Sequence, residues 1–162
     1  MDQYSKDLKV KCHFKLVDFN EETLNFAVNQ VKEANKSELC SITGEIQSVL
    51  NLVKKSVNQK CETSKYDLVY CSGLFDYLSD QICSKLVKMF YEMLTVGGKV
   101  HVTNMHSDDI CHPNDNFMQE LLFEWYLIYR NEKQMSKLFP DVSKQKIYTD
   151  PTGINLCLEI SK

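Results

Sequence analysis

The chain has 162 residues, of which 43% are apolar and 25% are charged, and its formal net charge is -3. This is the profile of a globular domain whose apolar side chains suffice for a core. The slightly negative charge argues against a nucleic-acid backbone as the main partner. No apolar run approaches the roughly 20 residues that cross a bilayer, and the amino terminus lacks an apolar signal segment. We expect a single cytoplasmic domain over residues 1–162 that acts on a small molecule and does not insert into a membrane.

The first third of the chain alternates between strand and helix patterns. Residues 10–17 predict a strand, and apolar residues at three- and four-residue steps over 24–34 predict one face of a helix. A second strand is expected over 39–43, where Gly44 would end it. An amphipathic pattern over 46–57 then predicts a second helix.

The middle of the chain continues the alternation. The clearest strand pattern covers 66–71, and a helix is expected from about Asp80 to Leu94, stopped by Gly97-Gly98. Another strand follows over 99–104. The apolar and aromatic run over 117–129 is long enough for a further helix.

The end of the chain predicts a short helix over 132–138 and then two β-rich runs, 144–149 and 154–160. The residues between these runs, 150–153, are Asp-Pro-Thr-Gly, which suit a tight reversal. Strands separated by amphipathic helices indicate an α/β protein with a mostly parallel sheet covered by helices. The closing hairpin adds an antiparallel strand.

This order of elements resembles the Rossmann-like fold of class I S-adenosylmethionine-dependent methyltransferases from its second strand to its last. Three segments carry the resemblance: KLVDFN at 15–20, YDLVYCSGLFDYLSD at 66–80 and LTVGGKVHVTN at 94–104. The phrase GLFDYLSD, with NMH at 104–106 and FEWYLIYR at 123–130, further resembles a bacterial subgroup associated with 3-hydroxypalmitic acid methyl ester biosynthesis.

The first strand of that family and its Gly-x-Gly-x-Gly loop have no counterpart in this sequence. We therefore expect a domain that is incomplete at its amino terminus and that is inactive by itself. An uncovered sheet edge exposes hydrogen-bonding groups. The chain is expected to form a homodimer through that edge or to take up a complementing segment there.

The resemblance implies S-adenosylmethionine as the cofactor. Asp18, at the carboxyl end of the first strand, would accept hydrogen bonds from the ribose hydroxyls, with Phe19 beside the adenine. The alternative role of Asp18 is to cap the following helix. Glu45 would lie near the adenine amino group, or would be an acidic residue in the first turn of a helix. Ile46 would contact the purine.

Two further groups follow the strand patterns at the same edge of the sheet. The backbone of Cys71, Ser72 and Gly73 would border the methionine portion of the cofactor, where glycine permits close approach. Asp76 is a candidate catalytic carboxylate that is hard to explain as a core residue. His106 is a candidate general base or hydrogen-bond donor, or else a solvated loop residue. Methyl transfer from a sulfonium needs mainly an in-line approach.

Aromatic residues and the sole arginine are candidates for substrate binding. Phe75 and Tyr77 would lie over the substrate, or would be core aromatics. Arg130 is a candidate for bidentate binding of a substrate carboxylate, with Tyr126 and Tyr129 beside an apolar chain. The alternative, which we prefer, is a core helix that ends in a cation.

Neither a metal site nor a disulfide framework is expected. A polar cluster, His106, Asp108, Asp109, Cys111 and His112, matches no standard zinc spacing. The seven cysteines are odd in number, and several lie in apolar runs where reduced cysteine behaves as a small hydrophobe.

The leading hypothesis is methyl transfer from S-adenosylmethionine to an oxygen of a small molecule, such as the carboxylate of a fatty or other apolar acid. One alternative is a non-catalytic fragment or pseudoenzyme that acts through protein contacts. A nicotinamide-dependent dehydrogenase is a third hypothesis, because both folds place a ribose-binding acid at a strand end. The terminal hairpin argues against it.

Overall fold

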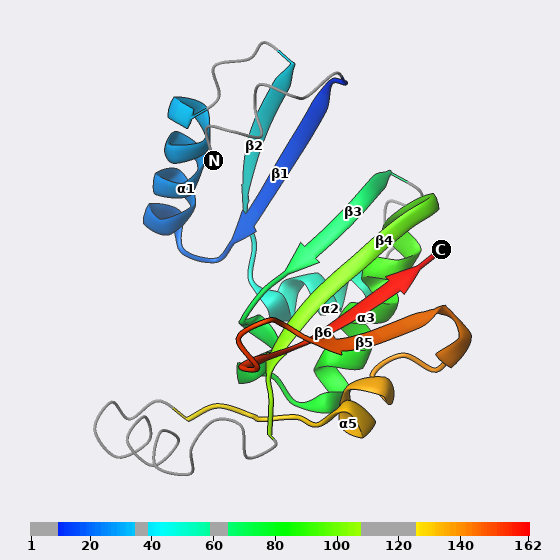
Figure 1. The fold of residues 1–162 in the computed structure, drawn as a ribbon. Helices are drawn as coiled ribbons and strands as arrows, with labels where there is room; N and C mark the ends of the chain where they lie inside the picture. Colours follow the sequence, from blue (N-terminus) through cyan, green and yellow to red (C-terminus); the bar gives the residue numbers. More distant parts are fainter. Residues whose placement is uncertain (1–9, 35–38, 59–64, 108–125) are drawn as a thin grey trace. The chain divides into compact units, whose positions relative to one another are not determined.

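The computed structural model describes residues 10–34, 39–58, 65–107 and 126–162 (Figure 1). The chain divides into two compact units, Met1–Lys54 and Lys55–Lys162. Each unit is described by itself. Within the described residues, no helix combines the length and the apolar character needed to cross a membrane.

The first unit contains two parallel strands, β1 (Cys12–Asp18) and β2 (Cys40–Ile46), joined through helix α1 (Glu21–Ala34). The helix begins after Asn20, whose side chain accepts a hydrogen bond from the Thr23 N–H (3.0 Å). This satisfies one of the free donors of the first turn. The predicted strand–helix–strand order is confirmed here.

The prediction that Gly44 ends the second strand is wrong. β2 continues through Gly44 to Ile46, and helix α2 (Val49–Asn58) begins later than the sequence pattern suggested. A Cβ at position 44 would lie 3.2 Å from side-chain atoms of Leu24 and of Val28 in α1. Glycine therefore allows close packing of helix on strand here, rather than a stop.

The second unit contains a mixed four-stranded sheet in the order β3-β4-β6-β5. Its strands are β3 (Tyr66–Cys71), β4 (Leu94–Met105), β5 (Gln145–Thr149) and β6 (Asn155–Ser161). β3 and β4 are parallel, whereas β6 is antiparallel to both β4 and β5. The predicted α/β class and the closing hairpin are confirmed.

One face of this sheet forms the core of the second unit. Helix α3 (Asp80–Met93) lies against β4, and Figure 1 shows it behind the sheet. The side chains with no exposed surface include Leu86 and Val87 of α3 and, on the sheet, Val100, Val102, Leu156, Leu158 and Ile160. From Gly98 onward, the even-numbered positions of β4, like those of β6, face this core because side chains alternate along a strand.

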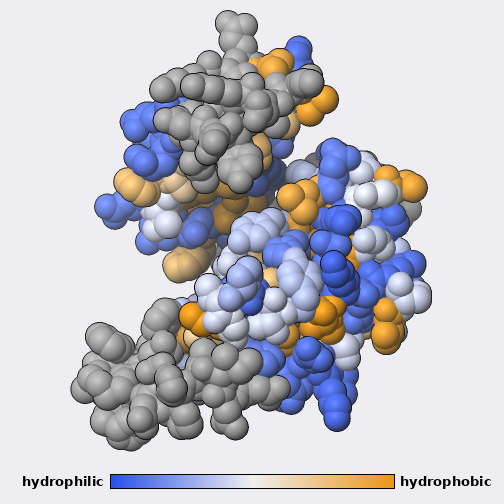
Figure 2. Space-filling model, viewed as in Figure 1, coloured by the Kyte–Doolittle hydropathy of each residue, from blue (hydrophilic) through white to orange (hydrophobic). Residues whose placement is uncertain are grey.

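The opposite face of the sheet is polar and aromatic. Tyr70 of β3 stacks on His101 of β4 with ring centroids 5.5 Å apart, and Tyr148 of β5 lies 6.3 Å from the same imidazole. Figure 2 shows mainly hydrophilic and intermediate side chains on this side of the second unit. Tyr70 and Leu68 remain more than half exposed.

The predicted helix over 80–94 is confirmed as α3, but Gly97 and Gly98 do not separate it from the next strand. β4 begins at Leu94, directly after α3, and includes both glycines. Gly97 has a positive φ of 83°, and a Cβ at Gly98 would lie 3.0 Å from the carbonyl oxygen of Tyr66. The pairing register between β3 and β4 shifts at this point. The two glycines thus form an irregular strand start.

The helix predicted over 117–129 lies mostly outside the described residues, and its described end is not helical. Residues 126–130 run alongside the end of β4. The Ile128 N–H donates to the carbonyl of Asp76 (2.7 Å), and the Arg130 N–H donates to that of Met105 (3.1 Å). Hydrogen bonds to distant segments thus replace those of a helix.

Short elements complete the second unit. Two 3₁₀ turns, η1 (Leu74–Tyr77) and η2 (Val142–Lys144), precede α3 and β5 respectively. Helix α5 (Glu132–Ser136) begins with a capping box between Asn131 and Gln134, so the predicted short helix is confirmed.

Candidate active site

The four cofactor-binding residues predicted in the first unit lie at the carboxyl ends of β1 and β2. Asp18 is the register partner of Ile46. The Asp18 Oδ1 accepts a hydrogen bond from the Asn20 N–H (2.8 Å), which shapes the turn before α1. Phe19 and Ile46 are both more than half exposed. The structure thus brings a carboxylate and two apolar side chains to the carboxyl ends of these two strands.

Glu45 lies within β2, and the alternative that places it in the first turn of a helix is therefore wrong. Its carboxylate forms an ion pair with Lys15 of β1, with 2.5 Å between Oε2 and Nζ. Both side chains are partly exposed, so this pair contributes little to stability.

In the second unit, the chain turns sharply after β3. Gly73 has a positive φ of 73°, a conformation that glycine adopts without strain. The Gly73 N–H donates to Thr103 Oγ1 (3.1 Å), and that hydroxyl also lies 3.1 Å from Ser72 Oγ. Thr103, which the sequence analysis missed, therefore ties Ser72 and Gly73 to β4. A polar residue near the end of an apolar strand was its only signal.

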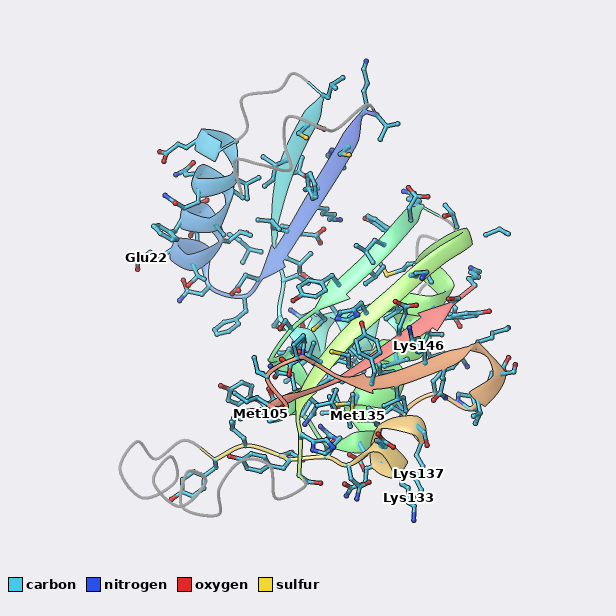
Figure 3. All side chains as sticks on the ribbon, viewed as in Figure 1. Glu22, Met105, Lys133, Met135, Lys137 and Lys146 are labelled. Atoms are coloured by element: carbon cyan, nitrogen blue, oxygen red, sulfur yellow. The ribbon has the colours of Figure 1, made fainter. Side chains whose placement is uncertain are left out.

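Asp76 is a buried carboxylate at this edge. Met105, labelled in Figure 3, lies at the end of β4, and its main-chain N–H donates to Asp76 Oδ1 (2.7 Å). Burial raises the pKa of Asp76, while the Met105 hydrogen bond and the positive charge of Arg130 act in the opposite direction. A carboxylate with this environment can exchange a proton at a pH closer to neutral than an exposed one.

The two aromatic residues of the same turn have different environments. Phe75 has no exposed surface, which agrees with the core interpretation of this residue. Tyr77 is more than half exposed, as is Tyr126, whereas Tyr129 is partly buried. Tyr77 and Tyr126 therefore have surface to offer a substrate, and Phe75 has none.

Arg130 is buried, with 1% of its surface exposed, and its guanidinium binds the protein itself. Its Nε and Nη2 both contact Asp80 Oδ1, at 2.9 and 2.8 Å. Nη2 also donates to the carbonyl of Leu78 (2.6 Å). Nη1 donates to the carbonyl of Phe75 (2.8 Å) and to Asn104 Oδ1. These five contacts match the five N–H groups of the side chain. The structure supports a core role, although not the predicted helical setting.

Asn104 is a second residue that the sequence analysis missed as a site residue. It is fully buried at the end of β4. Its Nδ2 donates to the carbonyls of Ile128 (2.8 Å) and Met105 (3.0 Å), while its Oδ1 accepts from Arg130. Its amide therefore links the end of β4 with residues 126–130.

His106 follows β4 and is 6% exposed, so the alternative of a solvated loop residue is wrong. Its main-chain N–H donates to the carbonyl of Ile154 (2.9 Å), and His106 pairs with Arg130 in an isolated bridge. The structure thus brings His106, Asp76 and Arg130 to the same end of the sheet.

Cysteine chemistry and metal binding receive no support from the described residues. Burial raises the pKa of the Cys71 thiol to about 12 and that of Cys83 to about 11, so both stay protonated and unreactive near neutral pH. The five described cysteines are free. The described residues include no group of three or more side chains arranged to hold a metal ion. Of the polar cluster noted in the sequence, only His106 lies within them.

The burial of Asp76 predicts a pH dependence of stability. Because its folded-state pKa is raised, the native state binds more protons than the unfolded state just above the ordinary pKa of about 4, and stability falls as pH rises there. The Asp76→Asn variant has no carboxyl group at this position, so its stability does not fall with pH for this reason. Its stability relative to wild type should therefore increase between about pH 3 and pH 7. Urea unfolding across that range measures the difference, with Asp67→Asn as the exposed control. A relative stability that falls with pH would contradict the assigned environment.

Comparisons with known proteins agree with this architecture at the level of fold. No protein-family model matches the chain, and no curated protein matches it in sequence. Among solved structures it resembles an O-methyltransferase family protein from Burkholderia thailandensis, with a TM-score of 0.64 and 11% identity over 100% of this chain and 55% of that one. It also resembles human N-acetylserotonin methyltransferase in complex with S-adenosylmethionine, with a TM-score of 0.59 and 17% identity over 93% and 41%.

A third similar structure is magnesium protoporphyrin IX methyltransferase from Synechocystis PCC 6803 with bound S-adenosylhomocysteine, with a TM-score of 0.59 and 12% identity over 99% of this chain and 78% of that one. Three further matching structures are covered over 64%, 55% and 42% of their length. The chain thus has the Rossmann-like α/β fold of methyltransferases, and it spans about half the length of many of these structures.

Proposed function

We propose that this chain is part of an S-adenosylmethionine-dependent methyltransferase that acts on an oxygen of a small molecule. One observation carries the proposal. In a fold shared with methyltransferases, the buried carboxylate of Asp76 is held at the carboxyl ends of β3 and β4, next to the turn at Gly73. Ligands of open α/β sheets bind at this end of the strands.

Each predicted cofactor contact has a role in this proposal. The main chain of Cys71, Ser72 and Gly73 is proposed to border the methionine portion, because glycine carries no side chain and adopts the positive φ of this turn without strain. Asp18 accepts hydrogen bonds from the ribose hydroxyls. The exposed Phe19 and Ile46 offer apolar surface to the adenine. Glu45 is proposed to face the adenine amino group from its place in β2.

The transfer itself breaks the bond between the methyl carbon and the sulfonium sulfur. The bonding electron pair stays on sulfur, which gives S-adenosylhomocysteine, and an acceptor oxygen forms the new bond to carbon. A hydroxyl acceptor must also lose a proton. Asp76 and His106 are the candidate proton acceptors, and a carboxylate acceptor needs neither.

The acceptor that we propose is an apolar acid, in line with the sequence resemblance to the 3-hydroxypalmitic acid methyl ester subgroup. The exposed rings of Tyr77 and Tyr126 are the proposed contacts for its apolar chain. Arg130 is not proposed to bind the acid group, because its guanidinium is already hydrogen-bonded within the protein.

The ribose contact is tested by replacing Asp18. In a fusion that supplies a strand and a Gly-x-Gly-x-Gly loop before residue 10, Asp18→Ala should weaken binding of S-adenosylhomocysteine by about 1.5–3 kcal/mol, the range for a hydrogen bond to a charged group. Calorimetric titration measures this loss, and Asp67→Ala on β3 is the matched control. An affinity equal to that of the parent fusion would assign Asp18 to the turn before α1 alone.

A second candidate function is protein contact through a sheet edge. Among the described residues β3 pairs with β4 alone, and its sequence carries no lysine or proline to block its other edge. Leu68 on this strand is 59% exposed. A second copy of the chain is the occupant we propose for this edge.

Light scattering tests this edge contact. The 162-residue chain should self-associate, and Leu68→Lys should shift it towards the monomer because a charge on an edge strand opposes pairing. Val96→Lys, at an exposed position of β4, is the control and should leave the association unchanged. A monomeric parent chain would exclude the contact.

A further inference from the structure

Arg130 connects three segments that are far apart in the sequence. Its guanidinium donates to the carbonyl of Phe75, the second residue of η1, and to the carbonyl of Leu78, the residue directly after η1. It also binds Asp80 at the start of α3 and Asn104 near the end of β4. The turn between β3 and α3 is therefore fixed from inside the protein.

Asp76 lies in the middle of that turn. Its carboxylate accepts from the Met105 N–H, and its carbonyl accepts from the Ile128 N–H (2.7 Å). Ile128 belongs to the same extended segment as Arg130, and Asn104 binds the carbonyl of Ile128. The main chain of Asp76 is therefore held by the segment that contains Arg130, and its side chain is held by the end of β4.

The charged and titratable groups around Asp76 come from four places. Cys71 of β3 and Cys83 of α3 remain neutral because burial raises the pKa of both thiols. His106 follows β4, and Asp80 of α3 forms an ion pair with Arg130. The positive charge of Arg130 acts on Asp76 and favours its ionised form.

We propose that Arg130 is a positioning residue for Asp76: its guanidinium holds the turn that carries this carboxylate against the end of β4, and its positive charge favours the ionised carboxylate. The use of Asp76 as a proton acceptor rests on the proposed methyl transfer. The positioning by Arg130 does not depend on that reaction.

Two variants separate the charge of Arg130 from its geometry. Arg130→Gln removes the charge, so the pKa of Asp76 should rise, because the positive charge that lowers it is lost. Arg130→Lys keeps the charge but loses the planar fork, so the pKa should change less while the turn loosens. Lys133→Gln removes an exposed cation three residues along the chain and should change neither property.

Carboxyl ¹³C NMR titration of the full chain measures the pKa of Asp76, with Asp76→Asn to assign its signal. Amide hydrogen exchange of residues 73–79 measures how often the turn opens. The exchange should be faster in both Arg130 variants than in wild type. An unchanged Asp76 pKa in folded Arg130→Gln, or an unchanged exchange rate in folded Arg130→Lys, would overturn the proposal.

A measurement on the unaltered chain covers the case in which neither variant folds. Arg130 is the only arginine, so arginine-selective ¹⁵N labelling gives a single side-chain Nε–H signal. Its hydrogen exchange should be more than about tenfold slower than that of free arginine, because exchange requires the buried hydrogen bonds to open. Exchange as fast as in free arginine would overturn the proposal.

The reaction provides a separate readout. In a fusion that binds S-adenosylhomocysteine, assayed with a hydroxyl acceptor, Arg130→Gln should lower kcat and shift the acidic limb of the pH profile to higher pH with the Asp76 pKa, leaving cofactor affinity unchanged. If the fusion binds no S-adenosylhomocysteine, the proposed function fails, while the NMR measurements still decide the role of Arg130.

Discussion

Phe75→Ala is expected to destabilise the second unit by about 3–5 kcal/mol, the range for removing a buried aromatic side chain. Phe75 has no exposed surface, whereas Tyr77 in the same turn is 53% exposed. Tyr77→Ala should therefore leave stability nearly unchanged and should instead weaken binding of an apolar acceptor. Urea unfolding of the two variants compares a core role with a substrate role within one 3₁₀ turn. Equal losses in both variants would contradict the assigned burial.

Arg130→Met should also destabilise the second unit, by roughly 1–3 kcal/mol for each buried acceptor that is left without its donor. The carbonyls of Phe75 and Leu78 and the amide oxygen of Asn104 would all lose their donor. Lys133→Met, on the exposed side of α5, is the control and should change stability by less than about 0.5 kcal/mol. Normal stability of Arg130→Met together with lost acceptor binding would return Arg130 to the substrate site.

The parts of the fold that could be predicted from the sequence are those with strong local patterns. β3 matches its predicted bounds of 66–71, because an apolar run between polar residues has a clear length and period. The reversal at 150–153 was recognised from its turn residues, and the Gly153 N–H donates to the carbonyl of Asp150 (3.0 Å). Such elements depend on neighbours in sequence.

The glycines were misjudged because their role depends on distant neighbours. Gly44 makes room for α1, and Gly98 lies against the backbone of β3. Gly44 lies within β2, which it was expected to end, and Gly98 lies within β4, which it was expected to precede. The extended segment 126–130 was read as helical for a similar reason: its apolar residues suit a helix, but its hydrogen bonds go to β4 and η1.

The candidate site was predicted by position more accurately than by role. Parallel strands end at one edge, so Asp76 and His106 were expected near each other from the order of elements alone. The role of Arg130 could not be predicted in the same way. Its acceptors at 75, 78, 80 and 104 come from segments whose meeting depends on the complete fold.

The central claim is that this fold binds S-adenosylmethionine, and calorimetric titration with its product tests it most directly. The fusion that supplies a strand and a Gly-x-Gly-x-Gly loop is titrated with S-adenosylhomocysteine and, separately, with NADH. The account predicts saturable binding of S-adenosylhomocysteine, no saturable binding of NADH, and much weaker cofactor binding by the 162-residue chain alone. Saturable binding of NADH by a fusion that does not bind S-adenosylhomocysteine would contradict it.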